Sequence, residues 1–127
     1  MSTAKVAEGL LFGSWTATRW RHTGASDPDQ TLDVIADLGG SVTLSLGNGA
    51  YILTCNMARR GIVNVAGTIT VRDEVMEFRA TGQSLAECVQ WKLENGTLTL
   101  RKDASSCDFD GNGNDVPATL NAEFVRL

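Results

Sequence analysis

Proline, histidine and runs of like charge are scarce in this sequence, and each scarcity narrows the classes of protein to which the chain can belong. Only 2 prolines and 1 histidine occur among 127 residues, whereas glycine occurs 13 times. This balance suits strands joined by tight turns. The basic residues cluster no further than Arg19-Trp20-Arg21 and Arg59-Arg60, and the formal net charge is −4. A mildly acidic chain without a basic patch argues against a nucleic-acid partner.

Long apolar runs and paired cysteines are also missing. No segment approaches the roughly 18–20 apolar residues needed to cross a bilayer, so no membrane span is expected. Residues 1–12 lack the apolar stretch of a signal peptide, which predicts a cytoplasmic protein, or a periplasmic or secreted one if the sequence is a mature form. The three cysteines (Cys55, Cys88, Cys107) match no zinc spacing. We expect three buried, reduced thiols, with one disulfide and one free thiol as the alternative.

Short segments in which apolar and polar residues alternate dominate what is present. Val42, Leu44 and Leu46 alternate with serine and threonine, which is typical of a half-buried strand. Gly47-Asn48-Gly49 and Asn95-Gly96 are favourable hairpin turns, because these residues tolerate positive φ. Such segments recur at 15–21, 31–35, 40–46, 50–57, 62–71, 75–81, 88–93, 97–102 and 118–126.

The spacing of these segments predicts an all-β fold. Consecutive short hairpins favour an up-and-down meander, and closing it into a barrel removes the exposed edges of the sheet. A chain of 127 residues suits one domain of this kind. We therefore expect a single antiparallel β-barrel of about eight strands over residues 1–127, with a short helical turn near residues 4–12.

An ordered series of motifs resembles the lipocalins and their calycin relatives, in particular small bacterial lipocalin-like domains. The first is Gly13-Ser14-Trp15, similar to the Gly-x-Trp that opens their first strand. The others are Gly-Gly-Ser-x-Thr-Leu-x-Leu at 39–46, Tyr-x-Leu-Thr at 51–54, Asp-x-Asp-Gly-x-Gly at 108–113 and Pro-Ala-Thr-Leu at 117–120. The resemblance implies structural roles for Gly13, Trp15 and Arg126: the indole plugs the closed end of the barrel, and the arginine of the last strand crosses its ring.

The alternation also predicts which side chains face a barrel interior wide enough for one small ligand. Arg19 shares the face of Trp15 by period two, and an inward charge requires an anionic partner or ligand. A bulge that turns Arg19 to solvent, or a pair with Glu77, is the alternative. The candidate ligand-binding residues are Arg19, Leu44, Leu53, Cys55, Met57, Phe78, Trp91, Leu100 and Phe124.

This mostly apolar lining predicts binding of a small hydrophobic molecule, with an acidic or carbonyl group near Arg19, by a monomer or homodimer without a cofactor. A second hypothesis is an enzyme that uses the same pocket for cyclisation or isomerisation of a small hydrophobic substrate. No catalytic residue can be assigned, because spacing alone identifies no nucleophile and base, and the lone His22 is expected on the surface. A third is a structural or protein-interaction module with a filled barrel and Trp20 on its outer face.

One acidic segment allows two interpretations. Asp108, Asp110 and Asn112 lie at alternate positions, as at the start of a calcium-binding loop. An EF-hand loop, however, places a glutamate at its twelfth position, which here is Thr119. Clusters of Asp, Asn and Gly also form ordinary turns, so we favour a turn and expect no metal.

Overall fold

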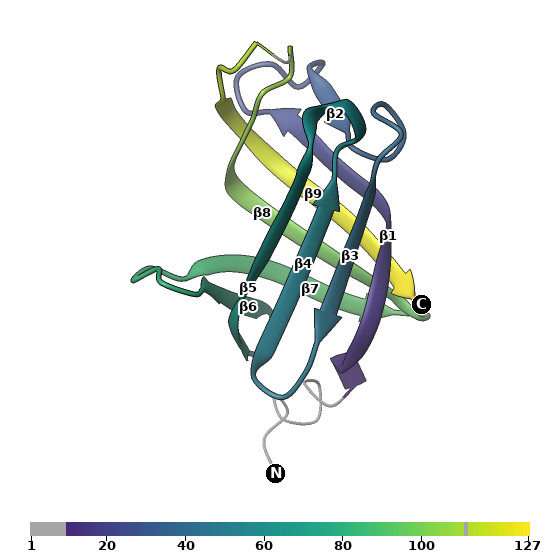
Figure 1. Ribbon diagram of the computed structural model, residues 1–127, viewed down its shortest axis with the longest axis vertical. Helices are drawn as coiled ribbons and strands as arrows, with labels where there is room; N and C mark the ends of the chain where they lie inside the picture. Colours follow the sequence, from purple (N-terminus) through teal and green to yellow (C-terminus); the bar gives the residue numbers. More distant parts are fainter. Residues whose placement is uncertain (1–9, 111) are drawn as a thin grey trace.

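The chain folds into one antiparallel sheet that closes on itself (Figure 1). The computed structural model describes residues 10–110 and 112–127, apart from the side chain of residue 59. The strands are β1 (Gly13–Gly24), β2 (Thr31–Asp33), β3 (Ser41–Leu46), β4 (Ala50–Asn56), β5 (Ile62–Val71), β6 (Val75–Ala80), β7 (Glu87–Glu94), β8 (Thr97–Cys107) and β9 (Val116–Arg126), with a 3-10 turn, η1 (Ala58–Arg60), between β4 and β5.

Pairing of the first strand with the last closes the barrel. β1 pairs with β3 at its start and with β9 along most of its length. The other strands follow one another in sequence order, so eight strands form the barrel. β2 is an additional short strand beside the end of β1. The predicted antiparallel barrel of about eight strands is confirmed. The predicted helical turn lies mostly outside the described residues; of its described part, Leu10 and Leu11 are in helical conformation.

The hairpin turns follow from the residues that the sequence supplies. Asn95 and Gly96 join β7 to β8 with φ values of +52° and +79°, the left-handed conformation that an Asn-Gly hairpin turn requires. Gly49 reaches φ +73° between β3 and β4. β3 and β4, which this turn joins, align so that Leu44 lies opposite Leu53. Both predicted hairpins are confirmed.

The start of β1, which carries Trp15, lies at the lower end of the barrel in Figure 1. The Trp15 side chain is 1% exposed, and its Nε1 donates a hydrogen bond to the carbonyl oxygen of Leu11 at 2.9 Å. The guanidinium carbon of Arg126 lies 4.3 Å from the centre of the indole, a cation–π arrangement. Nη1 of Arg126 also donates to the carbonyl oxygen of Phe12 at 2.7 Å, and Nη2 donates to that of Leu10.

Gly13 leaves the space that this arrangement needs. Its φ is +125°, and a Cβ at this position would lie 2.9 Å from Nη1 of Arg126. A larger residue would therefore strain the backbone and push the guanidinium off the indole. The Gly-x-Trp pattern thus has a local physical reason in this barrel.

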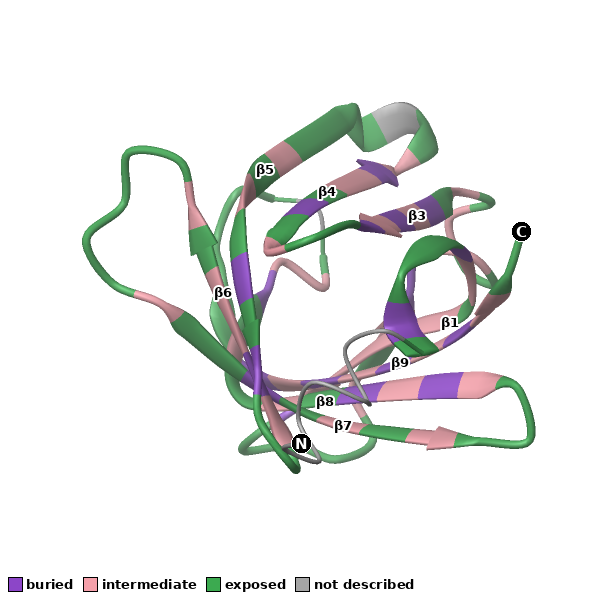
Figure 2. Ribbon diagram, turned by 90° about the horizontal axis from the view of Figure 1, so that it is seen from below, coloured by how far each residue is buried: buried purple, intermediate pink, exposed green. Residues whose placement is uncertain are grey.

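The wall of the barrel is incomplete in its upper half. β5 pairs with β6 only from Gly67 to Val71, and β7 pairs with β8 only from Gln90 to Glu94. The turn between β6 and β7 extends away from the barrel body (Figure 2). The upper parts of β5 and β8 consequently flank a lateral opening rather than a continuous sheet.

Candidate functional site

The barrel interior holds an apolar cavity of about 120 Å3. Four of the predicted ligand-binding residues line it: Leu44, Leu53, Phe78 and Leu100. The remaining lining residues are Trp20, Tyr51, Val65 and Glu87. Tyr51 and Phe78 pack edge to face, with ring centres 4.9 Å apart and planes at 85°. The floor of the cavity is therefore aromatic and aliphatic, with one carboxylate at its margin.

Two more open cavities adjoin this one and share Trp20 with it. One, of about 520 Å3, lies against the lateral opening and is bounded by Glu87, Lys102 and Ser105. The other, of about 340 Å3, is bounded by Met57, Arg60 and Asp115 among others. His22 lines both. An apolar chamber therefore continues into a polar mouth, with Trp20 at the boundary.

A β-bulge in β1 decides which side chains reach this site. Ala17 lies opposite Phe124, but the register shifts at Thr18, so that Arg19 lies opposite Glu123. The extra residue inverts the alternation of every side chain after it. Trp20 and His22 consequently face inward.

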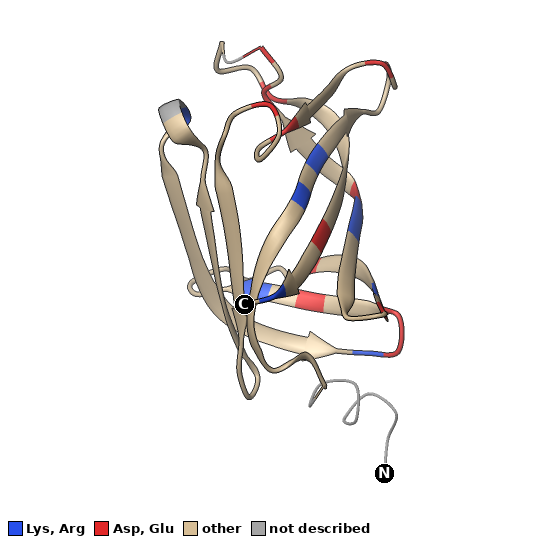
Figure 3. Ribbon diagram, turned by 90° about the vertical axis from the view of Figure 1, so that its right-hand side faces the viewer, with Lys and Arg blue, Asp and Glu red and all other residues tan. Residues whose placement is uncertain are grey.

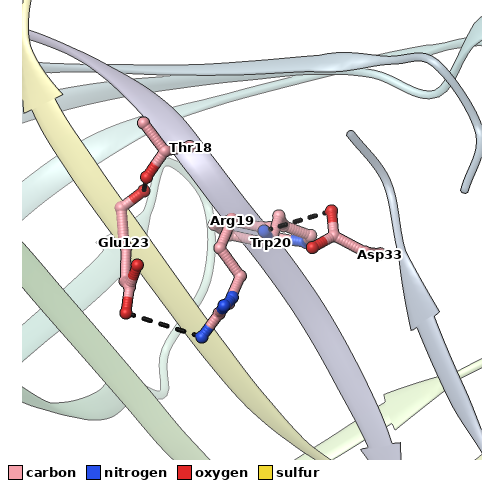
Figure 4. A network of polar contacts seen from close by, with 5 residues as sticks. All are labelled: Thr18, Arg19, Trp20, Asp33 and Glu123. Atoms are coloured by element: carbon pink, nitrogen blue, oxygen red, sulfur yellow. Dashed lines mark hydrogen bonds and ion pairs between the residues drawn. The ribbon is translucent and has the colours of Figure 1, made fainter. Parts of the chain in front are cut away.

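Arg19 lies on the outer face, where Nη1 is 3.6 Å from Oε1 of Glu123 and the side chain is 43% exposed (Figure 4). The prediction that Arg19 lines the cavity is wrong, because alternation from Trp15 holds only without a bulge. The same shift places Arg21 outside and Trp20 inside. The arginines therefore do not line the cavity, and Trp20 does not lie on the outer face as the interaction-module hypothesis required. The backbone N–H of Trp20 lies 3.5 Å from Oδ1 of the buried Asp33 (Figure 4).

The remaining predicted lining residues occupy three different surroundings. Cys55 and Phe124 are buried in the core, and Phe124 packs against Trp20 with ring centres 6.2 Å apart. Met57 borders the 340 Å3 cavity at the mouth. Trp91 packs against the margin of the core and borders a wide surface depression among charged residues, and its Nε1 donates to the carbonyl oxygen of Arg72 at 3.0 Å. Trp91 is therefore not part of the apolar chamber.

Lys102 supplies the cation that Arg19 does not. It lies opposite Leu120, a buried residue of β9, and its side chain is 20% exposed. Its Nζ is 3.0 Å from Oε1 of Glu87, at the start of β7 across the lateral opening. Period-two alternation after Leu98 and Leu100 predicts this inward orientation. No sequence pattern indicated the position of Glu87, which depends on how the β6–β7 turn leaves the barrel.

His22 is a half-buried imidazole in the mouth rather than a surface residue. Burial lowers its pKa below the usual value of 6.5, Asp115 opposes this shift, and Lys102 reinforces it. Among the described residues the imidazole makes no hydrogen bond. The neutral ring is therefore available as a donor or acceptor to a bound molecule. Burial and Glu87 likewise raise the pKa of Tyr51, which keeps its hydroxyl protonated.

The lowered pKa of His22 predicts a pH effect on stability. Because the folded state binds the proton less readily than the unfolded state, the contribution of His22 is present above about pH 6.5 and is lost as the pH falls through the lowered pKa. Relative to His22→Gln, the wild-type protein should become progressively less stable below that value. Thermal unfolding of both proteins from pH 8 to pH 5 measures the difference. A constant difference across this range would contradict the inward, desolvated position of His22.

The acidic loop forms turns. The carboxylate of Asp108 accepts hydrogen bonds from the backbone N–H groups of Asn112 and Gly113 at 3.2 and 2.8 Å. Oδ1 of Asn112 accepts one from Asn114 at 3.0 Å. Nη1 of Arg60 reaches across the mouth to the carbonyl oxygen of Asp108 at 2.6 Å. Within residues 10–110 and 112–127, no three His, Cys, Asp or Glu side chains gather as a metal site.

The cysteines are all free thiols. Cys55 and Cys107 are buried, and burial raises the pKa of both. Cys88 is exposed, so the prediction of three buried thiols is wrong for this residue, whose side chain points away from the core.

Comparison with known proteins adds no relative. The sequence matches no family model, and no curated protein or solved structure matches the chain. In the part of the chain that the structure describes, no helix is long and apolar enough to cross a membrane. The fold and the site therefore define the protein as a closed eight-stranded antiparallel barrel with an apolar chamber, which is consistent with a lipocalin-like fold.

Proposed function

We propose that this chain is a lipocalin-like protein, related to the calycins, that binds a small, mostly apolar molecule inside its barrel. The observation that carries the proposal is the apolar chamber bounded by Trp20, Tyr51, Leu53 and Phe78. A chamber of about 120 Å3 accommodates little more than one ring. The adjoining mouth extends the space toward the range of about 300–1,000 Å3 that is usual for small-molecule sites.

The mouth supplies the polar contacts that orient such a ligand. His22, Lys102 and Ser105 border the cavity that continues from the chamber. The neutral imidazole and the ammonium group can donate hydrogen bonds to a carbonyl or acidic group, while the rings of Trp20 and Phe78 hold the apolar part. The acidic or carbonyl group of the ligand, predicted to lie near Arg19, would therefore lie near Lys102 and His22 instead.

Filling the chamber should weaken ligand binding. Leu53 faces the chamber, whereas its neighbour Ile52 is 54% exposed on the outer face. We expect Leu53→Phe to weaken binding of 8-anilino-1-naphthalenesulfonate at least about tenfold, a loss of about 1.4 kcal/mol, because the added ring occupies the ligand's space. Dye fluorescence titration measures the affinity, and Ile52→Phe is the matched control.

Overpacking can itself destabilise a core by about 1–3 kcal/mol, so thermal unfolding must accompany the titration. Val65→Phe fills the same chamber from β5 and provides an independent variant. Equal dye affinity in the wild-type protein and in folded Leu53→Phe and Val65→Phe would place the dye on the outer surface and overturn the proposal.

A second candidate function is catalysis in the same chamber, for which the position of His22 is the favourable observation. A neutral, half-buried imidazole beside an apolar cavity has the character of a general base for isomerisation or cyclisation. Catalysis would make His22 indispensable for turnover while His22→Gln still binds the dye. A filled-barrel interaction module is the weaker alternative, because the chamber is not filled by side chains.

A further inference from the structure

The upper half of β5 presents a strand edge that lacks the usual protection. β5 pairs with β6 only from Gly67 onward, so residues 62–65 have no strand partner on that side within the described part of the chain. Natural proteins shield such edges with charged side chains, proline or bulges. The segment Ile62-Val63-Asn64-Val65 contains neither charge nor proline, and its register against β4 is continuous.

The facing edge, on β8, is protected. The pairing of β8 with β9 shifts register between Lys102 and Ser105, which marks a bulge. Lys102 and Asp103 also place charges along this stretch. Of the two edges that flank the lateral opening, only that of β5 is therefore suited to pair with a further strand.

The neighbouring strands β3 and β4 are uncharged as well, and the nearest charges along the chain are Arg59 and Arg60 in η1. Residues 38–58 and 61–71 contain no charged side chain. In Figure 3 the three strands at the left, β3 to β5, carry neither blue nor red, whereas β1 carries blue and β7 to β9 carry both colours. Ile62 is 63% exposed, and Ile52 on the neighbouring strand is 54% exposed. Val63 lies opposite the buried Cys55 and so faces inward, yet it is 44% exposed beside the opening.

We propose that this edge pairs with β5 of a second copy of the chain, antiparallel about a twofold axis, so that the sheet of one barrel continues into the other. Such an axis keeps the inner faces of the two strands on the same side only if one residue lies directly opposite its own copy. With the axis at Asn64, Val63 lies opposite Val65 of the second copy. The paired segment ends before Ala66, whose carbonyl oxygen already accepts hydrogen bonds from the N–H and the hydroxyl of Thr81. Every pair is uncharged.

A second copy suits this edge because the interface is self-complementary and the charges lie elsewhere. The net charge of −4 resides outside β3 to β5, so two uncharged edges meet without close repulsion between like charges. The paired segment is short, and its contact area falls below the roughly 800 Å2 per partner of stable complexes. The dimer is therefore weak and reversible.

Sedimentation equilibrium over an approximately hundredfold range of protein concentration tests the proposal. The average mass should rise from 13.6 kDa toward twice that value. Asn64→Lys places two ammonium groups opposite each other at the axis and should weaken the dimer at least about tenfold. Thr70→Lys is the matched control, because it lies on the same strand and the same face but where β5 is paired with β6. The control should dimerise like the wild-type protein.

Disulfide trapping locates the axis. In a Cys88→Ser background, which removes the exposed thiol, Asn64→Cys should oxidise to a covalent dimer, and Thr70→Cys should not. A protein that stays monomeric at every concentration, a dimer that persists in Asn64→Lys, or equal trapping at positions 64 and 70 would each overturn the proposal. None of these results would bear on dye binding.

Discussion

Replacing Trp15 by alanine should lower the free energy of unfolding by about 3–5 kcal/mol, the largest loss that we expect from a single substitution in this barrel. The indole is 1% exposed, its Nε1 is hydrogen-bonded to Leu11, and Arg126 covers its face. Alanine would leave a cavity at the closed end of the barrel. It would also remove the ring against which the guanidinium of Arg126 is held.

Urea unfolding followed by circular dichroism measures this loss. Trp91→Ala is the control, since Trp91 is only half buried and also has a hydrogen bond from its Nε1 to a carbonyl oxygen. The control should lose clearly less stability than Trp15→Ala. Equal losses would mean that Trp15 contributes no more to the free energy of unfolding than a half-buried apolar residue does.

Substituting Gly67 by alanine should also destabilise the barrel. A Cβ at this position would lie 2.0 Å from the carbonyl oxygen of Arg79 and 2.8 Å from the Cα of Ala80. Both contacts are with the backbone of β6, so no side chain can rotate away to relieve them. β6 would have to move, and the hydrogen bond from the N–H of Thr81 to the carbonyl oxygen of Ala66 would be disturbed. We expect a loss of about 1–3 kcal/mol or more.

Gly47→Ala separates this effect from the general cost of replacing glycine. A Cβ at Gly47 would meet nothing within 4 Å, so this variant should unfold close to the wild-type midpoint. The same urea experiment compares the two variants. If Gly67→Ala were as stable as Gly47→Ala, β5 and β6 would not approach each other as closely as the structure shows.

The site depends on the bulge at Thr18 more than on any single lining residue. One additional residue in β1 turns Trp20 and His22 into the barrel and Arg19 out of it. Trp20 then borders all three cavities, and His22 borders two of them. A regular strand would instead have placed an arginine inside, where it would need an anionic partner.

Local patterns in the sequence determined most of the architecture. The period-two alternation of β3 to β5 and the Asn95-Gly96 turn specify strands and hairpins through nearest-neighbour geometry, so they are readable without the fold. The same alternation identified Leu44, Leu53, Phe78 and Leu100 as chamber residues. The inward orientation of Tyr51 and Lys102 could also have been predicted, because each continues the alternation of its own strand.

Only the tertiary structure decided the register of β1 and the position of the polar groups. A bulge depends on how β1 and β9 twist against each other, and no glycine or other local residue at 17–19 marks it. The positions of Glu87 and of the free β5 edge depend on where the β6–β7 turn leaves the wall. Alternation therefore identified which residues share a face of a regular strand, whereas pairing between distant strands decided where β1 bulges and which faces look inward.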